Sequence, residues 1–122
     1  PWELIKHKGE TLMETFKGER FYDYTKSFKR YMKFLNNDFP VNYHLTFSRS
    51  EKTTDDIVRD LCLCGGNVAV VFRDHLPKSW LDIEVISGDA NDLRFLDKGG
   101  RIVGLIEKGL AKKDTTGFVV EP

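Results

Sequence analysis

The chain has 122 residues, with 19 Lys or Arg and 19 Asp or Glu, so its formal net charge is zero. This length supports one domain with a buried core, and the charge balance argues against a purely electrostatic binder of nucleic acids or anionic membranes. Apolar runs such as Val68–Phe72 are far shorter than the ~20 residues of a membrane helix. Because no basic and apolar leader opens the chain, we expect a cytosolic protein.

Up to residue 48 the chain alternates helix and strand patterns. Apolar residues three and four apart predict amphipathic helices, and alternation of apolar and polar residues predicts strands. The elements predicted here are a short helix over residues 10–17, a strand at Phe21–Thr25, a surface helix over 26–35 and a strand at Tyr43–Ser48.

The next segment contains the strongest strand pattern. Thr53 or Thr54 can cap a helix with an acidic first turn, and Gly65 and Gly66 end it. Residues 67–72 are almost wholly apolar and β-branched, which is typical of a parallel strand covered on both faces, so we place them in the middle of a sheet. The remaining predicted elements are a short turn or helix carrying Trp80, a strand at 83–86, a helical turn over 91–95 capped by Asp89, and a strand at Ile102–Ile106.

The spacing of the predicted strands indicates the fold class. They start at residues 21, 43, 67, 83 and 102, which leaves room for a crossover between each pair, whereas hairpins need far fewer residues. This predicts an α/β fold of parallel βα units, forming either a partial (half) β/α barrel or a small layered sheet. An α+β sheet with some antiparallel pairing is the alternative, since the last two gaps are short and weakly helical.

The two cysteines and three histidines do not form a metal-binding pattern. On a helix, Cys62 and Cys64 would point about 200° apart, and His7, His44 and His75 lack the paired spacing of zinc ligands. We therefore expect structural cysteines and no metal site, and the sequence identifies no cofactor.

Polar and charged residues follow the predicted strands, where parallel α/β sheets form their binding sites. Cationic side chains and hydroxyls beside helix starts suit a phosphate or a carboxylate. Alternation could also direct strand residues into one lumen, with His44 and Asp23 as an acid–base pair, although single residues of this kind are more often structural. No catalytic residue is assigned. The candidate residues for binding a small anionic ligand are Asp23, Thr25, Lys26, His44, Ser48, Arg49, Ser50, Arg73, Asp89, Asp92 and Lys108.

Several runs resemble a family of bacteriophage and prophage proteins of the gene-product-88 type, which are loosely radical-SAM-like in layout. The runs are FYDYTK at 21–26, NYHLTFSRSE at 42–51, NVAVVF at 67–72 and DLRFLD at 92–97, with shorter matches at 88–89, 102–105, 108–109, 112–114 and 117–119. The resemblance implies a β/α barrel whose N-terminal half carries a cysteine cluster for an iron–sulfur centre. Cys62 and Cys64 do not replace that cluster, so the resemblance implies a C-terminal half only.

Three hypotheses for the function follow. The first is a half-barrel that binds a small anionic ligand together with an N-terminal portion, supplied by a separate chain or by a second copy, because a half-barrel has open strand edges. The second is a non-catalytic, host-directed or regulatory binding protein that uses an exposed edge or the basic residues 108–113. The third is an enzyme for a nucleotide or another phosphorylated metabolite, held by Lys26, Arg49 and Arg73. No membrane partner is expected.

Overall fold

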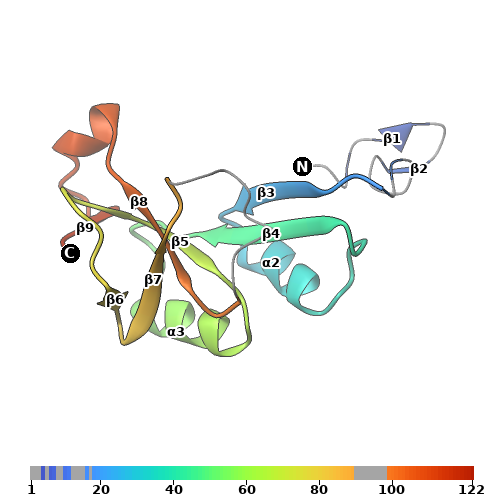
Figure 1. Cartoon of the computed structure of the whole chain (residues 1–122), viewed down its shortest axis with the longest axis horizontal. Helices are drawn as coiled ribbons and strands as arrows, with labels where there is room; N and C mark the ends of the chain where they lie inside the picture. The colour runs from blue at the N-terminus through green and yellow to red at the C-terminus, as the bar shows by residue number, and fades with distance from the viewer. Residues whose placement is uncertain (1–3, 5, 8–9, 12–15, 17, 90–98) are drawn as a thin grey trace.

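The structure, a computed structural model, describes residues 4, 6–7, 10–11, 16, 18–89 and 99–122. Figure 1 shows the arrangement of the elements. In chain order they are β1 (Lys6–His7), β2 (Glu10–Thr11), β3 (Phe21–Thr25), α2 (Phe28–Leu35), β4 (Tyr43–Ser48), α3 (Asp55–Leu63), β5 (Val68–Phe72), β6 (Ser79–Trp80), β7 (Ile83–Ser87), β8 (Ile102–Ile106), the 3-10 helix η3 (Gly109–Lys113) and β9 (Val119–Val120).

The described residues form a mixed α/β fold around an open, seven-stranded sheet. The strand order is β3-β4-β5-β8-β7-β6, and β9 pairs with β5. The five predicted strands are confirmed, and they run parallel to one another, with β5 in the middle. The sheet is open rather than closed, with edges at β3 and at β6, and a half β/α barrel is not confirmed.

Helices α2 and α3 lie on the same face of the sheet (Figure 1). The chain moves in one direction from β3 through β4 to β5, and right-handed crossovers then place both helices on one side. Ser27 caps α2 and Thr54, one of the two predicted caps, caps α3, because each side chain accepts a hydrogen bond from the helix backbone. The core between helices and sheet includes Tyr31, Leu45, Phe47, Val58, Leu61, Val68, Val70, Phe72 and Ile102.

Asn67, directly before β5, connects four elements by hydrogen bonds. Its N–H donates to the Tyr31 hydroxyl of α2 (2.8 Å), and that hydroxyl donates to the Asn67 carbonyl (3.0 Å). The same carbonyl accepts from Phe47 N of β4 (3.0 Å), and Asn67 Oδ1 accepts from Arg101 N before β8 (2.9 Å). Burial raises the pKa of the Tyr31 hydroxyl, which keeps it protonated as a donor.

The prediction of a turn or helix at Trp80 is wrong. β6 pairs antiparallel with β7, so this segment is a hairpin. Its two turn residues, Leu81 and Asp82, have φ angles of 53° and 62°, as a two-residue type I′ turn requires. Leucine rarely adopts this conformation, so the sequence carries no turn signal here.

Of two further local predictions, one differs from the structure and the other lies outside the described residues. Residues Glu10–Thr11 pair antiparallel with Lys6–His7, so the helix predicted over 10–17 is wrong at its start; residues 12–15 and 17 lie outside the described residues. A helical pattern this short is marginal, and strand pairing can override it. The turn predicted over 91–95 lies outside the described residues. Asp89, its predicted cap, accepts a hydrogen bond from Ile106 N (2.9 Å).

Gly66 allows Tyr31 to reach Asn67, which gives a stability prediction. A Cβ at Gly66 would lie 2.8 Å from the Tyr31 hydroxyl oxygen and 3.1 Å from Leu61 O, which is main chain. We expect Gly66→Ala to lower the free energy of unfolding by about 1–3 kcal/mol through overpacking, measured by urea denaturation. Gly18→Ala is the control, because a Cβ there meets nothing within 4 Å. Equal effects of the two variants would contradict the role of Gly66.

Candidate functional site

The carboxyl ends of the parallel strands do not lie level, because neighbouring strands are staggered. Thr25 lies beside Phe47 and Ser48 lies beside Ala69, so β3 and β4 both end near the start of β5. Arg73 follows β5, about 13 Å beyond Ala69 at the usual rise per residue of a strand. The carboxyl ends therefore form a step, with Thr25 and Ser48 on the lower level and Arg73 on the upper level.

The register also separates residues that the sequence suggested for one lumen. Asp23 lies beside Leu45, which belongs to the core under the helices, so Asp23 faces α2. There it accepts a hydrogen bond from Arg30 (3.4 Å). His44 lies beside Tyr22 in the register, and its ring packs edge-on against Phe34 of α2 (centroids 5.5 Å apart). Asp23 and His44 are not an acid–base pair in this structure.

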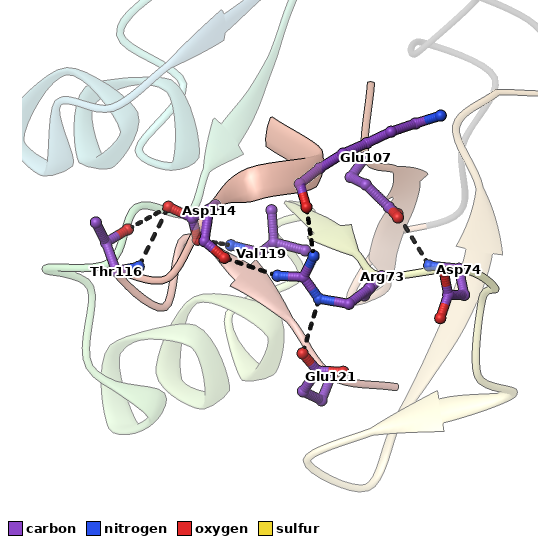
Figure 2. Close-up of polar contacts among 8 residues, drawn as sticks. Arg73, Asp74, Glu107, Asp114, Thr116, Val119 and Glu121 are labelled. Atoms are coloured by element: carbon purple, nitrogen blue, oxygen red, sulfur yellow. Dashed lines mark hydrogen bonds and ion pairs between the residues drawn. The ribbon is translucent and has the colours of Figure 1, made fainter. Parts of the chain in front are cut away.

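Arg73 binds a segment near the end of the chain with all three nitrogen atoms of its guanidinium group (Figure 2). Nε donates to Glu121 Oε1 (2.8 Å), Nη1 to Lys112 O (2.9 Å) and Nη2 to Asp114 O (2.8 Å). The hydrogen bond to Glu121 raises the pKa of Arg73. We call residues 112–121 the closing segment, since they cover the upper level of the step.

The closing segment is shaped by a turn around Asp114 (Figure 2). The Asp114 carboxylate accepts from the Thr116 hydroxyl (2.6 Å) and N–H (3.3 Å), and from Val119 N (3.0 Å). These hydrogen bonds lower the pKa of Asp114. Sequence reasoning missed this turn, although Asp-Thr-Thr-Gly at 114–117 carries the side-chain-to-backbone signal of Asx and Ser/Thr turns.

Arg49, at the end of β4, binds the other side of the closing segment. Its Nη1 donates to Gly117 O (2.9 Å) and Phe118 O (3.1 Å), and its guanidinium lies over the Trp80 ring (5.6 Å to the centroid). Arg49 Nε is buried without a hydrogen-bond partner. Burial lowers the pKa of Arg49. Lys26 Nζ lies 5.1 Å from the centroid of the Phe118 ring, so Lys26 and Arg49 contact the same residue of the closing segment.

The carboxylates near the ends of β7 and β8 accept hydrogen bonds from backbone N–H groups, and one of them pairs with a lysine. Asp89 Oδ2 accepts from Ile106 N (2.9 Å), and Asp89 Oδ1 lies 3.4 Å from Lys108 Nζ. Glu107 is buried, and its Oε2 accepts from Asp74 N (2.9 Å), as Figure 2 shows. Each of these carboxylates therefore stabilises a strand end.

The other predicted site residues have local roles or lie outside the described part. Thr25 Oγ1 accepts from Ser27 N (3.1 Å) at the start of α2, and Ser50 N donates to Thr53 Oγ1 (3.1 Å) within its own turn. Asp92 lies outside the described residues. Among the candidates, the structure thus brings together Lys26, Arg49 and Arg73 through the closing segment, and Asp89 with Lys108.

Comparison with known proteins gives one match. The model of the Gene product 88 family matches residues 1–122. No curated protein and no solved structure is significantly similar. The match supports the phage-type resemblance, but it does not support a radical-SAM-like half-barrel or a C-terminal half only. In the described part of the chain, no helix is long and apolar enough to cross a membrane, and no group of His, Cys, Asp and Glu is placed to hold a metal ion.

The two cysteines differ in environment, and we expect them to differ in reactivity. Cys64 is exposed, whereas Cys62 is buried and its pKa is raised by burial to about 11. Because the thiolate is the reactive form, a thiol reagent at neutral pH should modify one equivalent in the native protein and a second only after guanidinium is added. The Cys64→Ser variant should give no native reaction. Rapid modification of both thiols would contradict the buried position of Cys62.

The turn around Asp114 predicts an acid-sensitive closing segment. Folding lowers the pKa of Asp114 below its ordinary value of 3.8, so the ionised carboxylate stabilises the folded state at pH values above 3.8. This stabilisation is lost as the pH falls through the lowered pKa of the folded state. We expect the Val119 amide, measured by NMR hydrogen exchange, to be protected at neutral pH and to lose protection at acidic pH. In Asp114→Ala that protection should fall about tenfold at neutral pH.

Asp56→Ala is the control for this experiment, because Asp56 is an exposed carboxylate at the start of α3. The control should leave the protection of Val119 unchanged. If Asp114→Ala also left it unchanged, the closing segment would be held without the Asp114 turn.

Proposed function

The chain belongs to the Gene product 88 family, a phage-type protein family, and for this member we propose that it binds a small anionic ligand at the carboxyl end of β4. Arg49 is the principal cation of this proposed site. Lys26 contacts the ring of Phe118, whose carbonyl binds Arg49, and the Trp80 ring lies against the guanidinium.

The observation that carries the proposal is that Arg49 is partly buried and makes no ion pair within 4 Å with any described residue. Ion pairs within 4 Å join Arg30 to Asp23, Arg59 to Asp56, Arg73 to Glu121 and Arg101 to Glu84. Arg49 is partly buried and has no carboxylate within 4 Å among the described residues; Asp55 and Glu51 act on it only at longer range. A cation partly removed from water without a carboxylate in contact is costly, and an anion bound here would reduce that cost.

The free groups of Arg49 define the class of ligand. Nη1 is used for two main-chain carbonyls, whereas Nε and Nη2 make no hydrogen bond to the described residues. These two nitrogen atoms form one edge of the guanidinium, which suits a bidentate carboxylate or phosphate oxygen pair. Because Nε is buried, a ligand reaches this edge only when a neighbouring group moves aside.

Three carboxylates at the strand ends and in the closing segment favour binding over catalysis. Asp89, Glu107 and Asp114 each accept a backbone N–H, and a carboxylate used in this way is poorly placed to exchange protons with a substrate. This observation also favours the second candidate function, a regulatory protein that acts by binding alone. We propose an enzymatic role for none of these groups.

Binding can be tested by thermal unfolding with inorganic phosphate, citrate and AMP at constant ionic strength. A ligand at 100 times its Kd stabilises the folded state by about 2.7 kcal/mol, which shifts Tm by several degrees. We expect a saturable shift with at least one of these anions, and binding at least tenfold weaker in Arg49→Ala because the bidentate contact is lost.

Arg59→Ala is the matched control, since Arg59 lies on α3 and already has a carboxylate partner. It should respond to the anion as the unmodified chain does. We take a Kd of about 10 mM as the upper limit for a specific site. The proposed function is wrong if none of the three anions shifts Tm at about 10 mM, or if the anion shifts the Tm of Arg49→Ala as much as that of the unmodified chain.

A further inference from the structure

One side of β5 is shared by two strands placed end to end. β8 pairs with the whole of β5 on the other side. On the shared side, β4 pairs with Val68 and Ala69, and β9 pairs with Val71 and Phe72. Without β9, the upper half of this side would be an open strand edge. We call it the acceptor edge.

The closing segment shows which chemistry the acceptor edge recognises. Arg73 N donates to Val120 O (2.9 Å), and the Arg73 side chain pairs with Glu121 (2.8 Å). Val119 is buried, and Val120 packs against the core. The edge therefore takes an extended segment with two apolar residues followed by a carboxylate, which is recognition by strand addition.

The connection between β8 and the closing segment buries little. No residue of η3 is buried, and Leu110 is 88% exposed. Gly109, its first residue, has a φ of 57° and nothing within 4 Å of its Cβ position. A glycine in this conformation can rotate without a steric penalty, so the closing segment can swing about Gly109, and its departure withdraws only Val119 and Val120 from the core.

We propose that the acceptor edge also binds the closing segment of a second copy of the chain, so that two copies exchange these segments. The second segment would make the same hydrogen bonds and the same ion pair as the chain's own, which is the basis of domain swapping. Exchange competes with the intramolecular contact, whose effective concentration is in the millimolar range for a short connection. The proposal does not depend on anion binding at Arg49.

Two full-length variants separate the chain that donates its closing segment from the chain whose acceptor edge receives it. Glu121→Lys keeps the acceptor edge intact but places a cation opposite Arg73. Arg73→Ala keeps the closing segment intact but removes three hydrogen bonds at the edge. Mixed at about 0.5 mM, a concentration chosen to approach the intramolecular one, they should form a 1:1 heterodimer in size-exclusion chromatography with light scattering. Each variant alone should dimerise at least tenfold more weakly.

The control mixture replaces the donor by Arg73→Ala/Val119→Asp, which puts a charge into the buried position of β9 and should abolish the heterodimer. If both mixtures stay monomeric, or both form the dimer equally, segment exchange at this edge is wrong. Phosphate-induced Tm shifts in the same variants report on Arg49 separately, so that failure of one proposal is distinguishable from failure of the other.

A second measurement applies if circular dichroism shows that either single variant is unfolded. A fluorescent peptide of residues 114–122 is then titrated into the unmodified chain and followed by anisotropy. We expect saturable binding, and at least tenfold weaker binding of the same peptide with Glu121→Lys. No binding, or equal binding of both peptides, would overturn the proposal.

Discussion

The position of β4 relative to β5 depends on the hydrogen bonds of Asn67. Its carbonyl accepts from Phe47 near the end of β4, and the Tyr31 hydroxyl holds the same peptide group from α2. β4 consequently ends where β5 begins, and the upper half of β5 has no partner on that side until β9 arrives. The step at the carboxyl ends, the closing segment and the contacts of Arg73 all follow from this stagger.

Much of the sheet could be predicted from the sequence, because β3, β4, β5 and β8 have patterns that agree with their tertiary environment. β5 is the clearest example: it is apolar throughout and lies in the middle of the sheet. The register could not be predicted, since alternation fixes which residues share a face within one strand but not which residue of the next strand lies beside it. For this reason the pattern grouped Asp23 with His44, whereas in the structure Asp23 binds Arg30 and His44 packs against Phe34.

The candidate site was predictable in its residue types but not in its partners. Arg49 and Arg73 stand at strand ends, as the sequence indicated, and both are used. Their main partners are carbonyls and one carboxylate from residues 112–121 of the same chain. A two-residue strand such as β9 has no detectable periodicity. Its partner β5 also lies far away along the chain, with β6, β7 and β8 in between. No local pattern could therefore have shown that this segment pairs with β5.

The pairing of β9 with β5 also has a consequence for the order of folding. Contacts that close long loops form late and slowly, because the entropy of closure is lost before the contact is gained. The hydrogen bonds of Asn67 with Arg101 and Tyr31 join residues 34 and 36 apart, whereas Arg73 and Glu121 are 48 apart. A species in which β9 has not yet paired would expose one bare strand edge, which favours association between chains as protein concentration rises.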